Sequence, residues 1–135
     1  MFFCVKQVSI GLVYTFQPHQ IVCLEHESTR LYAEVIEVVI PRQVCWVRPV
    51  MLAVPMAGNE QLPIPSPEQL TVYDLRSGSD LLWPASLFKP ALDTEVIPLL
   101  GQLDVEADKS SEAHQHLSRF ISKVWQAYQN LFQRS

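Results

Sequence analysis

The pattern of apolar and polar residues predicts a strand-rich first part of the chain. Apolar residues alternate with small or polar ones over 10–16, and runs rich in Val, Ile, Tyr and Trp follow at 20–26, 31–40 and 43–54. Polar breaks of turn length separate these runs, which is typical of consecutive antiparallel strands joined by hairpins. We therefore predict that residues 1–54 form three or four antiparallel strands.

Two prolines and the alternation within one run refine this prediction. Proline donates no ladder hydrogen bond, so Pro41 is expected at a strand end and Pro49 at an edge or a bulge. Strict alternation over 31–40 places one set of side chains on one face of the sheet and the remainder on the other. The first set is Ala33, Val35, Glu37 and Val39.

Residues 55–69 predict a loop. The segment PMAGNEQLPIPSPEQ holds four prolines and one glycine, and this composition favours a partly polyproline II conformation. Loops of about 15 residues in a compact domain are often functional. The loop is therefore interpreted either as the rim of a binding site or as a plain crossover.

Residues 70–108 predict a short strand followed by turns. LTVYDL at 70–75 is typical of a strand, and Gly78 in the turn at 76–80 is free to take a positive φ. Pro84 and Pro90 exclude a long helix, although short helical turns fit around residues 85–88. TEVIPLL at 94–100 is interpreted as a short apolar strand or extended segment.

The end of the chain predicts an amphipathic helix over 110–133. Either Ser110 or Ser111 is suited to cap it, and no Gly or Pro interrupts it. Its apolar residues recur at spacings of three and four, as a helix requires: Leu117, Phe120, Ile121, Val124, Tyr128, Leu131 and Phe132.

Strands first and a helix last indicate an α+β fold. The chain has 135 residues, which is the size of one domain. We predict an antiparallel sheet that is curled or barrel-like, with the C-terminal amphipathic helix packed on it.

Charge is unevenly distributed along the chain. Residues 1–58 hold four basic and four acidic residues, residues 59–108 two basic and nine acidic, and residues 109–135 four basic and one acidic. The formal net charge is −4, so general attraction to nucleic acid or to anionic lipid is not expected.

The cysteines indicate a reducing compartment. Cys4, Cys23 and Cys45 are odd in number, widely spaced and set in apolar runs, which favours buried reduced thiols over disulfides or a zinc site. The N-terminus lacks the basic region of a signal peptide, and no segment approaches the roughly 20 apolar residues of a membrane helix. We therefore expect a cytoplasmic protein that has no membrane partner.

No motif in the sequence specifies a reaction. GxSxG, GxGxxG and the P-loop are absent, so neither catalytic residues nor a cofactor are predicted. His114 and His116 would point about 200° apart on a helix, so no metal site is predicted. The carboxylates of the strand-rich region are interpreted as partners in cross-strand ion pairs with Arg30, Arg42 and Arg48; they are Glu25, Glu27, Glu34 and Glu37.

Large aromatic residues are more numerous than a small core requires. A surplus of exposed aromatics is typical of protein interfaces, although each of these residues could also belong to the core. We predict a partner-binding groove where the helix meets the sheet, near Trp125 and Tyr128. The candidate partner-binding residues are Trp83, Phe88, Trp125, Tyr128 and Phe132.

Two stretches resemble a group of small cytoplasmic proteins from cyanobacteria that includes the carboxysome assembly factor. They are LYAEVIEVVIPRQVCWVRPVMLAV at 31–54 and YDLRSGSDLLWPASLFKPALDTEVIPLL at 73–100. The resemblance implies a non-enzymatic helper that engages a carboxysome shell protein through the flexible tail of that protein. It assigns no role to any individual residue.

The function expected from the sequence is therefore that of a non-enzymatic protein-interaction or assembly factor, which binds a flexible segment of a partner. Two alternatives stay open. One is a small enzyme with an unrecognised site, and the other is a β-barrel that binds single-stranded nucleic acid, indicated only by Trp46 between Arg42 and Arg48. The oligomeric state is not determined by the sequence.

Overall fold

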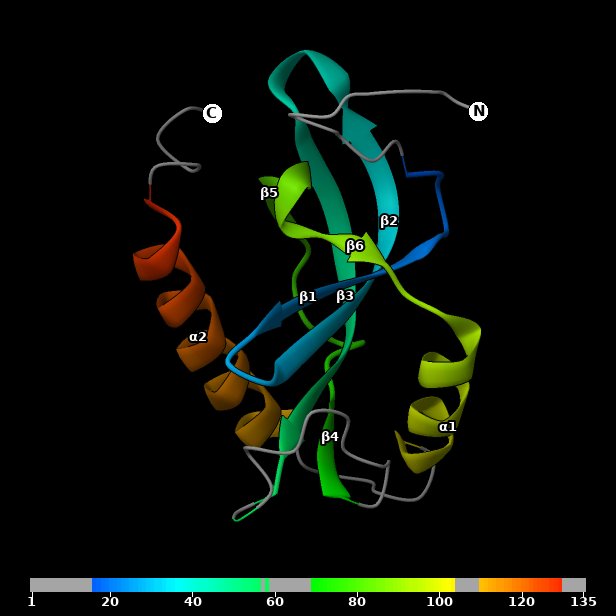
Figure 1. Ribbon diagram of the computed structural model, residues 1–135, viewed down its shortest axis with the longest axis vertical. Helices are drawn as coiled ribbons and strands as arrows, with labels where there is room; N and C mark the ends of the chain where they lie inside the picture. The colour runs from blue at the N-terminus through cyan, green and yellow to red at the C-terminus, as the bar shows by residue number, and fades with distance from the viewer. Residues whose placement is uncertain (1–15, 57, 59–68, 104–109, 130–135) are drawn as a thin grey trace.

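The fold is an antiparallel sheet between two helices (Figure 1). The computed structural model describes residues 16–56, 58, 69–103 and 110–129. The strands are β1 (Ile21–His26), β2 (Thr29–Val39), β3 (Val44–Pro55), β4 (Leu70–Asp74), β5 (Leu81–Pro84) and β6 (Lys89–Pro90). The helices are α1 (Asp93–Leu103) and α2 (Ser110–Ala127), and two 3-10 turns, η1 (Ile40–Arg42) and η3 (Ala85–Leu87), connect strands.

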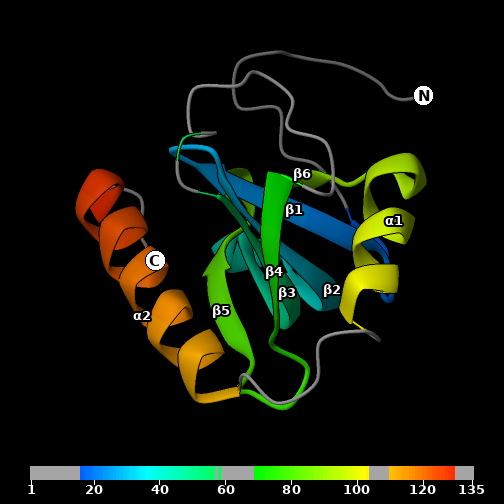
Figure 2. The ribbon, with the colours of Figure 1, turned by 90° about the horizontal axis from the view of Figure 1, so that it is seen from below.

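The sheet is open, so the barrel-like prediction was wrong. The strand order is β4-β3-β2-β1-β6, and β5 pairs with the first half of β3 while β4 pairs with its second half. Among the described residues, no pairing joins β6 to β4 or β5, so the sheet does not close. The apolar side chains on both faces of the sheet are buried by helices and not by closure into a barrel. The two helices lie on opposite faces of the sheet (Figure 2), and each covers one hydrophobic cluster.

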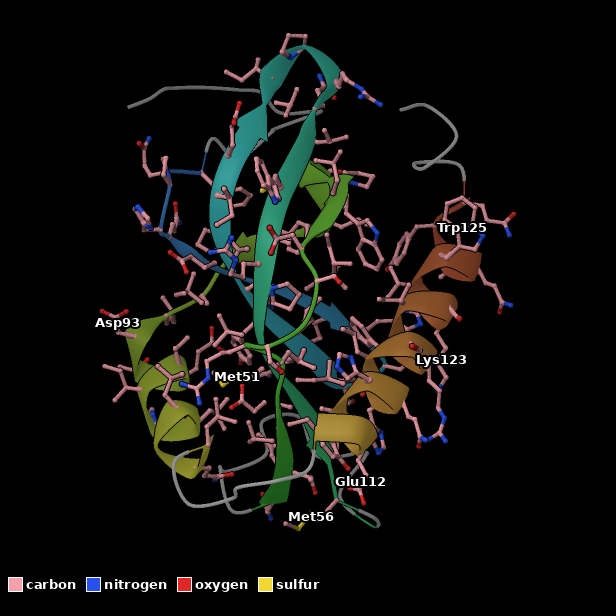
Figure 3. All side chains as sticks on the ribbon, turned by 180° about the vertical axis from the view of Figure 1, so that it is seen from behind. Met51, Met56, Asp93, Glu112, Lys123 and Trp125 are labelled. Atoms are coloured by element: carbon pink, nitrogen blue, oxygen red, sulfur yellow. The ribbon has the colours of Figure 1, made fainter. Side chains whose placement is uncertain are left out.

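Two hydrophobic clusters fill the spaces between these layers. One packs α2 on the sheet and includes Ala113, Leu117, Phe120 and Val124 from the helix. The other packs α1 on the opposite face, where Figure 3 shows Met51 between the sheet and that helix. Three consecutive residues of β3, 51–53, are buried, as are 22–24 and 31–33, because both faces of this half of the sheet are covered.

The helix α1 corrects the prediction of an extended segment at 94–100. Val96, Leu99 and Leu103 recur at helical spacing and are buried against the sheet. The backbone N–H of Leu92 donates to Glu95 Oε1 at 2.9 Å, which is the backward half of a capping box. Pro98 lies inside the helix, so it removes one helical hydrogen bond without ending the element.

Bulges account for the remaining differences in the first strands. Pro49 faces Ala33 while Met51 faces Tyr32, which leaves Val50 as the extra residue, so the prediction that Pro49 lies at a bulge is confirmed. A second irregularity between Val35 and Glu37 shifts the alternation of β2 by one residue. As a result Val38, and not Glu37, joins the cluster under α2, and the strict alternation predicted for 31–40 is wrong beyond Val35.

The hairpins and turns largely follow the sequence. The strands expected at 20–26, 31–40, 43–54 and 70–75 are present, and so is the helical turn within 85–88. The turn between β1 and β2 consists of Glu27 and Ser28, both at positive φ (50° and 70°). Gly78 does not have a positive φ, but an added Cβ would lie 3.3 Å from the Leu75 carbonyl oxygen.

Some predictions fall on residues outside the described ranges. They concern the alternation over 10–15, most of the loop at 55–69, the side chains of Ser110 and Ser111, and the last turns of the helix. The predicted helix start at 110 is confirmed.

Candidate binding groove

A cavity of about 190 Å³ lies between α2, the tip of the β1–β2 hairpin and the end of β3. We call it the α2 groove. It is lined by four residues of α2 and five residues of the sheet. They are His116, Arg119, Phe120 and Lys123 from the helix, and His26, Glu27, Thr29, Leu52 and Val54 from the strands and the hairpin turn.

The floor of the groove is apolar. Leu52 and Phe120 belong to the cluster under α2 and are 1% and 4% exposed, and Val54 packs against the same cluster. Leu52 and Val54 share this face because alternate residues of a strand point the same way. Their position at the end of β3 leaves a gap next to Phe120 that the helix does not fill.

The rim of the groove is rich in cations. Lys123 Nζ lies 3.8 Å from Glu27 Oε1, and both side chains are about two-thirds exposed, so this ion pair is weak. Arg119 is exposed and has no hydrogen-bond or ion-pair partner among the described residues. The groove therefore presents one unpaired guanidinium and one weakly paired ammonium next to an apolar floor.

Two histidines form opposite parts of the wall, and aromatic contacts hold both. His116 stacks on Tyr73 with ring centroids 4.3 Å apart and an interplanar angle of 23°. His26 meets Tyr128 edge-on with centroids 6.0 Å apart, and its Nε2 lies 3.9 Å from Glu27 Oε1. These contacts fix α2 against β4 at one end of the groove and against the hairpin tip at the other.

The predicted partner-binding residues lie in different surroundings. Trp83 and Phe88 are core side chains, 8% and 1% exposed, so they are not accessible to a partner in this structure. Trp125 and Tyr128 are 43% and 37% exposed, and Phe132 lies outside the described residues. Tyr128 meets a residue of the groove, His26, edge-on.

Trp125 lies on α2 but on the other side from the groove. Residues two apart on a helix point about 200° from each other, and Lys123 lines the groove. Lys123 and Trp125, both labelled in Figure 3, lie in the C-terminal half of α2. A cavity does lie between the helix and the sheet, but none of the five predicted partner-binding residues is among its described lining residues. The spacing of His116, Arg119 and Lys123 at i, i+3 and i+7 could have revealed it, since such residues share one helix flank.

A second polar cluster holds Trp46 and Arg48. Trp46 Nε1 donates to Asp80 Oδ2 at 2.9 Å, and Arg48 Nε donates to Asp80 Oδ1 at 3.1 Å. The pKa of Asp80 is lowered by these hydrogen bonds, more by the one from Arg48 than by the one from Trp46. Arg48, one of the two cations that suggested nucleic-acid binding, is therefore already paired with a carboxylate.

The predicted cross-strand ion pairs are realised only in part. Arg30 Nε lies 3.7 Å from Glu25 Oε1 across the β1–β2 ladder, as expected. Glu34 instead lies 2.7 Å from His19 Nδ1, and Glu27 faces Lys123. Glu34 does face Arg48 in the β2–β3 register, but Arg48 pairs with Asp80 instead. The helices α1 and α2 also bring partners that strand pairing alone does not supply.

Cys23 and Cys45 are free thiols and are fully buried, as predicted. They lie on opposite faces of the sheet, and Cys4 lies outside the described residues. Burial raises the pKa of Cys23 to about 12 and that of Cys45 to about 11. Both thiols are therefore protonated near neutral pH and are poor nucleophiles.

The size of the α2 groove limits what it can hold. Small-molecule sites usually occupy about 300–1,000 Å³, whereas this cavity measures about 190 Å³. The groove suits one or two side chains of a larger partner better than a whole cofactor. In the described part of the chain, no group of three or more His, Cys, Asp or Glu residues has a metal-binding arrangement.

No protein-family model, curated protein or solved structure matches this chain significantly. Within the described ranges, neither α1 nor α2 has the length and apolar character needed to cross a bilayer.

Proposed function

We propose that the chain is a non-enzymatic protein-interaction or assembly factor that binds a flexible segment of a partner in the α2 groove. The observation that carries the proposal is the juxtaposition of two features: Arg119, which is exposed and unpaired within the described ranges, and the apolar floor formed by Leu52, Val54 and Phe120. Partner segments are commonly recognised by an apolar pocket surrounded by polar groups.

The form of the groove favours an extended segment over a folded domain. Its walls stand on two different elements, a helix and a hairpin tip, and the space between them accepts side chains rather than a broad surface. A segment that orders on binding loses conformational entropy, so we expect micromolar affinity.

The resemblance of residues 31–54 and 73–100 to the cyanobacterial proteins described above supports a more specific form of the proposal. In that form the partner is a carboxysome shell protein, the segment is its flexible tail, and the chain acts in the cytoplasm. The free thiols of Cys23 and Cys45 support a reducing compartment of this kind. Neither alternative function has a specific observation in its favour: Arg48 is paired with Asp80, and the pKa of each described cysteine is raised.

The test is a titration of purified carboxysome shell protein, with and without its flexible tail, into the wild-type chain. We expect binding that requires the tail. Thr29→Trp, which places a bulky ring in the groove wall, should weaken it, while Thr94→Trp on the exposed side of α1 should not. If both variants bind like wild type, the α2 groove is not the binding site. If the intact shell protein does not bind, the proposed partner is wrong.

A further inference from the structure

The charges at the rim of the α2 groove select the chemistry of the segment that it binds. Arg119 and Lys123 stand one helical turn apart on the same flank of α2, and both line the cavity. Among the described lining residues Glu27 is the only carboxylate, and its Oε1 lies 3.8 Å from Lys123 Nζ. Within the described part of the chain the guanidinium of Arg119 has no hydrogen-bond or ion-pair partner, so its donors are available to a ligand.

We propose that the groove recognises an acidic-apolar peptide segment, an inference that rests on the proposed function. One Asp or Glu side chain of the segment pairs with Arg119, and a neighbouring Leu, Ile or Phe side chain fills the space above Leu52, Val54 and Phe120. A guanidinium binds a carboxylate through two parallel hydrogen bonds, which fixes the orientation of the segment as well as attracting it. The groove therefore requires two neighbouring features in the segment, an acidic side chain for Arg119 and an apolar side chain for the floor.

Lys123 contributes to the same preference through its weak pairing. Its contact with Glu27 measures 3.8 Å between two largely exposed side chains, so a second carboxylate of the segment can compete for the ammonium at little cost. The described helix α2 carries Arg119 and Lys123 against one acidic residue, Glu112, so this wall of the groove has a net positive charge that attracts an acidic segment.

The experiment is a selection of random short peptides displayed on phage against the immobilised wild-type chain. We expect the selected peptides to carry Asp or Glu next to Leu, Ile or Phe. A labelled synthetic peptide of the consensus sequence should bind, and its analogue with Asn and Gln in place of the acids should bind roughly tenfold or more weakly.

Two variants of equal charge change separate the groove from general electrostatics. Arg119→Gln and Ser118→Glu each lower the net charge by one, but Ser118 is exposed and shares its helix flank with Trp125, on the other side of α2 from the groove. We expect Arg119→Gln to weaken the consensus peptide roughly tenfold and Ser118→Glu to leave it nearly unchanged. Equal effects of the two variants would overturn the inference.

The outcomes distinguish this inference from the proposed function. If Thr29→Trp abolishes binding of the selected peptides but they show no acidic preference, the groove binds segments and the inference about their charge is wrong. If neither a selected peptide nor the tail of the shell protein binds the wild-type chain, the proposed function itself is wrong. A charge reversal on both sides gives a direct check of the pairing. If the Arg119→Glu variant binds a peptide in which Lys or Arg replaces the acidic residue, the pairing of Arg119 with a carboxylate is supported.

Discussion

The hydroxyl of Tyr32 donates a hydrogen bond to Glu95 Oε2 at 3.2 Å and so joins β2 to the first turn of α1. Arg30 Nη1 lies 3.5 Å from the same oxygen, and the other carboxylate oxygen accepts from the Leu92 backbone N–H. Tyr32 is fully buried, and burial raises the pKa of its hydroxyl. One carboxylate thus caps the helix and satisfies a buried donor of the sheet.

Glu95→Ala should therefore destabilise the protein by about 1–3 kcal/mol, because it removes a helix cap and leaves the Tyr32 hydroxyl without its acceptor. Urea unfolding measures the loss. Glu112→Ala, the same substitution in the first turn of α2, is the control and should cost much less because Glu112 is exposed. Equal losses would mean that Glu95 acts only through its charge near the helix N-terminus.

The packing of α2 depends on Phe120. Its ring is 4% exposed, belongs to the cluster under α2 and forms part of the groove floor. Phe120→Ala should lower the free energy of unfolding by about 3–5 kcal/mol, through lost burial and the cavity left behind. Gln126→Ala, on the exposed side of the same helix, should change it by less than about 0.5 kcal/mol. A loss below about 1 kcal/mol for Phe120→Ala would contradict this packing of α2.

The two described thiols make stability depend on alkaline pH. Folding raises the pKa of Cys23 from 9.0 to about 12 and that of Cys45 from 9.0 to about 11. The folded state therefore holds its thiol protons to higher pH than the unfolded state does, and stability falls as pH rises above about 9 towards 11.

Urea melts between pH 8 and pH 11 measure this loss. A Cys23→Ala, Cys45→Ala double variant should show a flatter decline than wild type, although it starts from a lower stability because methyl-sized groups replace buried sulfur. The same thiols should react with a thiol reagent at neutral pH only at the rate of unfolding. Fast labelling of either cysteine in the folded protein would contradict the buried position.

The class of fold could be predicted from the sequence because hydrophobic periodicity reports local structure directly. The alternating runs give β1 to β4, and the regular spacing of Leu117, Phe120 and Val124 gives α2. The prediction failed for α1 because the short apolar run at 94–100 was interpreted as a strand or extended segment. Val96, Leu99 and Leu103 instead recur at helical spacing and are buried, and Pro98 inside the short helix costs only local hydrogen bonding.

The shape of the sheet and the lining of the groove depend on tertiary contacts that local patterns do not contain. The continuous apolar runs IVCL and VMLAV are typical of strands that are covered on both faces. A sheet with one helix on one face, as predicted, does not account for such runs, whereas the observed sheet between two helices does. The groove combines residues 26–29, 52–54 and 116–123, which only the packing of the hairpin tip against α2 brings together. The sequence could indicate the helix flank with His116, Arg119 and Lys123, but it could not indicate which residues of the sheet lie opposite that flank.

The hairpin tip of the groove wall is strained and can be stabilised. Glu27 and Ser28 both have positive φ, as a two-residue type I′ turn requires, and residues with a Cβ adopt this conformation at a cost. Ser28→Gly should raise the free energy of unfolding by about 0.5–1 kcal/mol, because glycine populates positive φ freely. Ser118→Gly in the exposed side of α2 should lower it by about 0.5 kcal/mol, the usual cost of glycine in a helix. Destabilisation by Ser28→Gly would show that the serine side chain contributes more to the turn than its backbone conformation costs.

Tyr128 and Trp125 should contribute differently to partner binding, although both are exposed aromatic residues of the same helical end. Tyr128 contacts His26, a wall residue of the α2 groove. Tyr128→Ala should therefore weaken binding of the tail segment several-fold, both by removing an amphipathic contact surface and by releasing the His26 ring. Trp125 points to the other side of α2, so Trp125→Ala should leave the affinity within about twofold of wild type.

Calorimetric titrations of both variants with the same peptide decide between the two residues. A larger effect of Trp125→Ala than of Tyr128→Ala would place the partner on the opposite flank of α2 and would contradict the groove as the binding site.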